Sequence, residues 1–317
     1  MIDTEAQYRA VVRVLPAWYR ADRGDEMVGT LLDLHGERDR AALWSELWAL
    51  LALGVRTRLA GRAAPARTVA LGDLVRQVVL LGLVWGVLRS AGKASETLWV
   101  LFSFSGPYPG NFRSVLTSDL LTELIRLAVS LIPLVLLVDG WRRAARIAAG
   151  AILAAGAIWF LAKHSSGLGP ESVLYFAPQW LPLVLLPAAF HVDAPLPPSR
   201  PWWWVIGGSL VFAPALALRF GLPGDPDQIT GLSPLVWLCV LAGAGYLVFR
   251  HRIGPRPGWT LALALCIALA VVQNVVLKNG IIPFGAMVIA QVCCAGVIVA
   301  ALAVAGIRDY RRVVADR

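Results

Sequence analysis

Charged residues are scarce in this chain of 317 residues. Asp, Glu, Lys and Arg make up 15% of it, whereas hydrophobic residues make up 58%. A typical soluble domain carries about 25% charged residues. The composition therefore argues against an ordinary soluble globular domain and favours a protein that lies within a lipid bilayer.

Cysteine and histidine are also scarce, with four residues of each. All four cysteines fall in apolar segments and none belongs to a C-x-x-C pair, which argues against a disulfide framework and against structural zinc. The histidines are scattered along the chain. Because a P-loop, a dinucleotide fingerprint and an Asp-rich phosphate motif are also missing from the sequence, we expect no enzyme activity, no metal and no cofactor.

Long apolar runs, by contrast, are abundant. A bilayer core of roughly 30 Å is crossed by about 20 apolar helical residues. Stretches of this kind predict eight membrane-spanning helices at 70–88, 120–138, 144–162, 172–190, 202–220, 231–249, 258–277 and 282–306. Pro178, Pro182 and Pro187 are predicted to break the fourth span. The apolar run at 98–104 is too short to cross, and we expect it at the membrane interface or packed on the outer face.

Basic residues predict the orientation of these spans. Ten arginines precede the first span, and alternate loops and the tail hold most of the others among the 29 basic residues. The positive-inside rule then places both termini in the cytoplasm of a cell-membrane protein. The formal charge of +9 follows from this topology and from anionic lipid headgroups, with no nucleic acid as a partner. Residues 1–60 lack an early apolar core, so no cleavable signal peptide is expected.

The first 65 residues differ from the rest. Tyr8, Val11, Val12 and Leu15 have the spacing of one helix face, and a second helix is predicted at 19–34. Asp39 is predicted to cap a third helix. The fold class is therefore an all-α membrane bundle of eight helices, 66–307, preceded by a three-helix cytoplasmic domain, 1–65, and followed by a short basic tail, 308–317.

A series of residues near the N-terminus resembles a known group of proteins. The series is Tyr8-Arg9, Arg13, Leu15-Pro16, Tyr19-Arg20 and Gly24-Asp25-Glu26-Met27. It is similar to the helical prefix of many actinobacterial multi-pass membrane proteins, which include permeases and uncharacterised proteins encoded beside transcriptional regulators. The resemblance implies a bacterial membrane protein. Together with the mixed charge of the first fifty residues, it suggests an interaction module, for which we hypothesise the partner-binding residues Tyr19, Arg20, Glu26 and Met27.

Polar side chains inside the spans are energetically costly, so each is a candidate for function. Glu123 and Arg126 lie on one face of the second span, where a local ion pair is the alternative explanation. Counted at about 1.5 Å per residue, Arg126 and amide groups of three later spans lie in the outer half of the membrane. We hypothesise an outward-facing pocket for a small polar or anionic ligand, bound by Glu123, Arg126, Gln179, Asn274, Lys278 and Gln291.

Three functions are compatible with these features. The first is a regulatory or sensory protein that signals from the pocket to the cytoplasmic module. The second is a transporter or permease subunit for a small polar or anionic solute, and the third is an intramembrane enzyme. Clear internal repeats and a convergent set of catalytic groups, which would favour the second and third, are missing from the sequence. Expected partners are the lipid bilayer, a cytoplasmic regulatory protein and a second copy of the chain.

Overall fold

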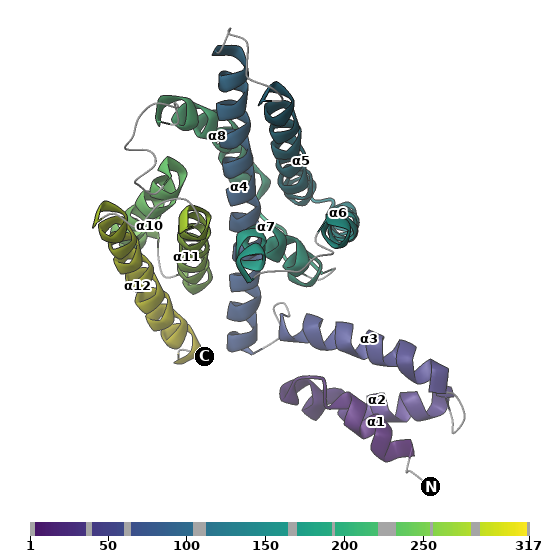
Figure 1. Cartoon of the computed structure of the whole chain (residues 1–317). Helices are drawn as coiled ribbons and strands as arrows, with labels where there is room; N and C mark the ends of the chain where they lie inside the picture. The colour runs from purple at the N-terminus through teal and green to yellow at the C-terminus, as the bar shows by residue number, and fades with distance from the viewer. Residues whose placement is uncertain are drawn as a thin grey trace. The chain divides into compact units, whose positions relative to one another are not determined.

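The fold is helical throughout the part of the chain that the structure describes. This computed structural model describes residues 4–35, 40–59, 65–103, 112–163, 170–191, 194–220, 233–253, 256–279 and 286–315. Its helices, shown in Figure 1, are α1 Thr4–Val12, α2 Ala17–His35, α3 Arg40–Arg58, α4 Ala66–Ser103, α5 Phe112–Val138, α6 Arg142–Lys163, α7 Pro170–Ala189, α8 Ser199–Phe220, α10 Pro234–Ile253, α11 Pro257–Asn279 and α12 Ala286–Ala315. The chain forms two compact units, Met1–Asp73 and Leu74–Arg317.

The N-terminal unit contains helices α1, α2 and α3, at the three places where the sequence predicts helices. Asp39, the predicted cap of the third helix, lies outside the described residues. The core of the unit is made of six buried side chains, Tyr8, Val12, Leu15, Val28, Leu31 and Leu50. The guanidinium of Arg58 donates a hydrogen bond of 2.9 Å to the carbonyl of Val14. This hydrogen bond links the end of α3 to the turn that follows α1.

Six helices of the described part are long and apolar enough to cross a membrane: α4, α5, α8, α10, α11 and α12. They coincide with the first, second and last four predicted spans. Helices α6 and α7, of 22 and 20 residues, occupy the third and fourth predicted spans but are not among the six. The structure thus supports a multi-pass helical bundle and leaves the crossing of α6 and α7 as a prediction.

Two local expectations differ from the structure. Helix α7 runs as one helix through Pro178, Pro182 and Pro187, because neighbouring helices in a bundle compensate for the hydrogen bonds that proline removes. Helix α4 extends to Ser103, so the apolar residues 98–103 form its last turns and are no separate segment. The polar residues 89–97 include no proline that would interrupt the helix, and α4 continues through them.

Helix α4 is the centre of the larger unit. One of its sides contributes Val79, Leu80, Leu83 and Val87 to a cluster with α5, α6, α7 and α8. Trp85 belongs instead to a second cluster, with α10, α11 and α12. Figure 1 shows α4 running between α5 and α6 on one side and α10, α11 and α12 on the other.

Glycines bring α4 into close contact with its neighbours on the first side. A Cβ atom at Gly82 would overlap the ring of Pro182 on α7, and one at Gly86 would overlap the side chain of Ser130 on α5. Small residues at such points let the helix backbones approach closely. The contacts fix α4 against α5 and α7.

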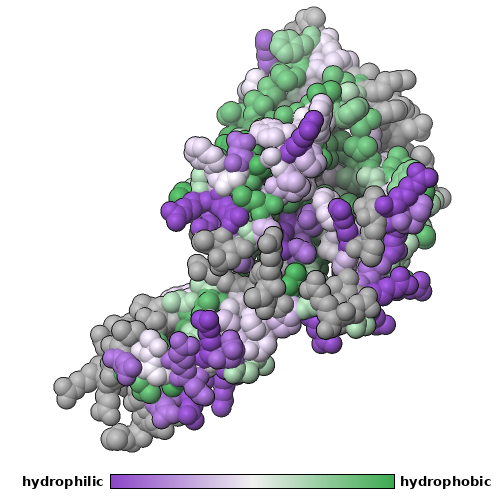
Figure 2. All heavy atoms as spheres, turned by 180° about the vertical axis from the view of Figure 1, so that it is seen from behind, coloured by the Kyte–Doolittle hydropathy of each residue, from purple (hydrophilic) through white to green (hydrophobic). Residues whose placement is uncertain are grey.

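The outer surface of the larger unit is rich in large apolar side chains. Phe102, Ile147, Ile158 and Val211 are among the most exposed of these, and Figure 2 shows apolar side chains across the upper part of the molecule. An apolar surface of this extent is typical of a region that contacts another molecule or lipid.

Candidate ligand cavities

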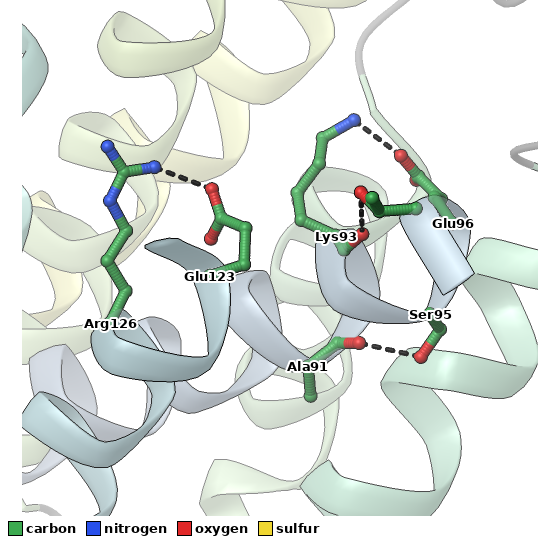
Figure 3. Close-up of polar contacts among 7 residues, drawn as sticks. Ala91, Lys93, Ser95, Glu96, Glu123 and Arg126 are labelled. Atoms are coloured by element: carbon green, nitrogen blue, oxygen red, sulfur yellow. Dashed lines mark hydrogen bonds and ion pairs between the residues drawn. The ribbon is translucent and has the colours of Figure 1, made fainter. Parts of the chain in front are cut away.

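The candidate site begins on one face of α4. Trp85, Arg89 and Lys93 follow one another at a spacing of four residues, which places them one helical turn apart on the same face. The hydroxyl of Ser95 donates to the carbonyl of Ala91 at 2.7 Å (Figure 3), and that of Thr97 donates to the carbonyl of Lys93 at 3.0 Å. The same helix therefore presents an indole ring and, beyond it, two cations.

A cavity of about 100 Å³ lies beside this face of α4. By this measure a water molecule takes about 10–15 Å³, so the space would hold several. Side chains from α4, α8 and α11 and from the start of α10 line this polar cavity: Trp85, Arg89, Lys93, Glu96, Ala217, Ser233, Pro234, Leu235, Ala270, Gln273 and Asn274.

The lining of the polar cavity carries two cations and one carboxylate. Lys93 Nζ pairs with Glu96 Oε2 at 2.5 Å (Figure 3), and the two side chains are 56% and 28% exposed. Among the described residues of the lining, the two cations Arg89 and Lys93 thus outnumber the one carboxylate, Glu96, which leaves an excess of positive charge. An anion is the ligand that this excess favours.

Two amide side chains of α11 complete the polar cavity. The indole Nε1–H of Trp85 donates to Oε1 of Gln273 at 3.3 Å, which joins α4 to α11. The Oδ1 atom of Asn274 is buried, and the described residues offer it no hydrogen-bond donor. A buried acceptor without a donor is unfavourable, so a ligand with a hydroxyl group, or water, would stabilise this arrangement.

A second cavity, an apolar groove of about 270 Å³, lies among the same four helices. Its lining is almost wholly apolar: Leu81, Val84, Trp85, Leu88, Val205, Gly208, Ser209, Phe212, Leu238, Cys239, Ala242, Leu263, Cys266 and Ile267. Val205 and Phe212 on α8 are also 41% and 63% exposed. The groove therefore reaches the apolar outer surface of the unit.

The predicted ion pair on α5 is present. Arg126 Nη1 donates to Glu123 Oε1 at 2.5 Å (Figure 3), with side chains 19% and 12% exposed. The second carboxylate oxygen, Oε2 of Glu123, is buried without a hydrogen-bond partner. Neither residue lines the polar cavity. The geometry corresponds to the local ion pair that the residue spacing offered as the alternative.

The other predicted ligand-binding residues divide into three groups. Asn274 lines the polar cavity. Gln179 and Gln291 are half-buried and do not line it. The side chain of Lys278 lies outside the described residues. The cavity that the structure shows therefore shares one residue with the predicted pocket.

The four predicted partner-binding residues lie on α2 in the N-terminal unit. Tyr19 and Met27 pack against its core, and the ring of Tyr19 meets that of Trp18 edge to face at 5.6 Å. Arg20 is half-buried, with Nε buried and without a hydrogen-bond partner. Glu26 is exposed. Of the four, Glu26 is the side chain most available to a partner.

Sequence reasoning missed Arg89, Lys93 and Glu96 because it ended the first span at Leu88 and assigned the polar residues after it to a loop. The repeat of four residues from Trp85 to Lys93 is the signal that could have found them. That repeat requires the helix to continue past the apolar run.

The described residues contain no group of three His, Cys, Asp or Glu side chains that could hold a metal ion. Six helices of the described part are long and apolar enough to cross a membrane, which indicates a multi-pass α-helical membrane protein. Comparison with protein-family models, with curated proteins and with solved structures found no match to this chain.

Proposed function

We propose that the chain is a sensory or regulatory protein of the cell membrane. An anionic ligand occupies the polar cavity, and the N-terminal unit passes this occupancy on to a cytoplasmic regulatory partner. The observation that carries the proposal is the lining of the cavity, which holds Arg89 and Lys93 with one carboxylate, Glu96. It also holds the buried Oδ1 of Asn274, to which the described residues offer no donor. This set of groups suits an anion that also carries a hydroxyl.

The proposal includes the topology that the arginines predict. Helices α6 and α7 cross the membrane with the six others, and both termini lie in the cytoplasm. Arg89 lies 23 residues beyond the start of α4 at Ala66, which is about 35 Å along the helix. That length is one crossing of a bilayer core, so the polar cavity opens on the side opposite to the cytoplasm.

Helix α4 provides the connection between cavity and N-terminal unit. Its first residues, up to Asp73, belong to the N-terminal unit, and the remainder belongs to the larger unit. It contains no proline, so a displacement at Lys93 reaches the other end of the same helix. A ligand shifts α4 from one placement to another only if it binds the protein more tightly in the second placement.

A transporter is the alternative function. The two cavities lie among the same four helices, as expected for a route by which a solute crosses the bundle. The apolar groove, however, offers almost no polar side chain. A small anion in the groove would lose its hydration without compensation. The geometry therefore supports binding at the polar cavity better than passage through the bundle.

Hydrogen exchange of the full chain in proteoliposomes of zwitterionic lipid tests the proposal, with inorganic phosphate as the probe anion. We expect phosphate to slow exchange around residues 85–96 and to change exchange in α1, α2 and α3. Under the proposed topology, phosphate should act only from the non-cytoplasmic side of the membrane. Lys93→Gln should lose both responses, because it removes one of the two cations.

The matched control is Arg113→Gln, which removes an exposed arginine of α5 outside both cavities. It should respond like the unmodified chain. Slower exchange near Lys93 with unchanged α1–α3 would contradict signalling, and accumulation of phosphate inside the vesicles would favour the transporter.

A further inference from the structure

The two cavities, taken together, have the shape and chemistry of an amphiphile. We propose that the ligand is an anionic phospholipid, with its phosphate in the polar cavity and one acyl chain along the apolar groove. The inference rests on the proposed function, because it names the ligand class for the same site.

The two cavities follow one another along every helix that lines them. On α10 the polar cavity takes Pro234 and Leu235 and the groove takes residues 238–242. On α11 the polar cavity takes residues 270–274 and the groove takes 263–267. On α4 they meet at Trp85, which lines both. One elongated molecule can therefore occupy both spaces with its polar end beyond the indole ring.

The combined length matches one leaflet of a membrane. From Lys93, which lines the polar cavity, to Leu81, the far end of the groove along α4, twelve residues span about 18 Å. Half of a bilayer core is about 15 Å. A phosphate at the level of Lys93 thus lies at the headgroup region, and its acyl chain lies along the groove down to Leu81.

The groove also has an entrance from the surrounding lipid. Phe212 and Val205 line it and are exposed on the outer surface of α8. A lipid already in the membrane can insert one chain between α8 and α10 without leaving the hydrocarbon. Since an apolar chain gains little from moving between lipid and protein, the charge of the headgroup selects the ligand.

The headgroup end matches a phosphate that bears a polyol. Arg89 and Lys93 provide the cations for the phosphate. Asn274 Oδ1, buried and without a donor, accepts a hydrogen bond from a headgroup hydroxyl. Phosphatidylglycerol has both groups, and phosphatidylcholine lacks both the hydroxyl and the net negative charge.

The test is a lipid titration of the full-length protein by native mass spectrometry, with phosphatidylglycerol, phosphatidylcholine and inorganic phosphate as separate arms. We expect phosphatidylglycerol to bind most tightly and to displace phosphate in the exchange experiment. Lys93→Gln should weaken phosphatidylglycerol binding about fivefold, the value of one basic residue at an anionic membrane surface.

A matched pair of glycines on α8 tests the position of the acyl chain. Gly208 lines the groove, and a Cβ there would meet Phe212 at an ordinary 3.8 Å. Gly207 is its neighbour outside the groove, with nothing within 4 Å of an added Cβ. Gly208→Leu fills part of the groove and should weaken phosphatidylglycerol binding by sterically excluding the acyl chain, and Gly207→Leu should leave the binding unchanged.

Two results would overturn the lipid inference while leaving anion sensing intact. One is phosphatidylglycerol binding no tighter than phosphatidylcholine although phosphate still slows exchange near Lys93. The other is equal binding by the two glycine variants. Conversely, tight phosphatidylglycerol binding with no response in α1–α3 would confirm the lipid site and overturn the signalling function. A variant that gains affinity, Glu96→Gln, keeps the test independent of folding defects.

Discussion

The two sides of α4 differ in how closely the neighbouring helices pack against them. Towards α5 and α7, Gly82 and Gly86 let neighbouring side chains pack directly on the helix backbone, and Val79 and Val87 are fully buried. Towards α8, α10 and α11, the larger Trp85 and Leu88 border the groove, which is not filled. Because close packing is the normal state of a protein interior, the unfilled side is the one available to a ligand.

The largest effect is expected from a bulky side chain on the close-packed side of α4. Gly86→Leu would place a side chain where Ser130 of α5 already lies, and overpacking of this kind destabilises by roughly 1–3 kcal/mol or more. Thermal unfolding of the purified protein, followed by tryptophan fluorescence, measures the loss. Gly150→Leu on α6, where an added Cβ meets nothing within 4 Å, is the control and should change little. Equal losses would show that close approach at Gly86 is not what holds α4 to α5.

A smaller effect is expected where the two cavities meet. Trp85→Phe keeps an aromatic ring and removes the hydrogen bond to Gln273, which should lower the free energy of unfolding by about 1 kcal/mol. Chemical unfolding in detergent measures it. Trp204→Phe, at a tryptophan of α8 that is 78% exposed, provides the comparison. If Trp85→Phe were as stable as Trp204→Phe, the link between α4 and α11 would not matter for stability.

The smallest change in stability, and a gain in binding, is expected at the rim of the polar cavity. Glu96→Gln removes the partner of Lys93, and an exposed pair of this kind contributes about 0–1 kcal/mol. Binding of phosphatidylglycerol should tighten about fivefold at low salt and lose part of that gain as salt screens the charges.

Glu5→Gln, which breaks the exposed Arg9–Glu5 pair in the N-terminal unit, is the charge-matched control for the rim. Its lipid affinity should equal that of the unmodified chain. Unchanged affinity in Glu96→Gln as well would mean that the headgroup does not lie beside Lys93.

The sequence predicts the helices of this protein well because a bilayer imposes both their length and their apolar composition. Hydropathy ends the first span at Leu88, however, although α4 continues to Ser103; helix continuity depends on backbone geometry, which hydropathy does not report. The prolines of α7 gave the opposite error: α7 continues through them, and the contact that Pro182 makes with Gly82 joins residues that lie far apart in the sequence.

The candidate site could be predicted only in part for a related reason. Counting residues along a span gives depth, and depth selected Asn274, which lines the polar cavity near one end of α11. It does not give the rotation of a helix about its axis. Arg126 has a suitable depth but lies with Glu123 on α5, whereas the neighbours of Asn274 in the cavity come from α4 and the start of α10.

The length of α4 has a mechanical consequence. With 38 residues the helix is about 57 Å long, nearly twice the thickness of a bilayer core. A rigid rod of that length is a lever. With the contacts at Gly82 and Gly86 as its pivot, a tilt of about 5° moves the Ala66 end, about 27 Å away, by about 2 Å in the direction opposite to the Ser103 end.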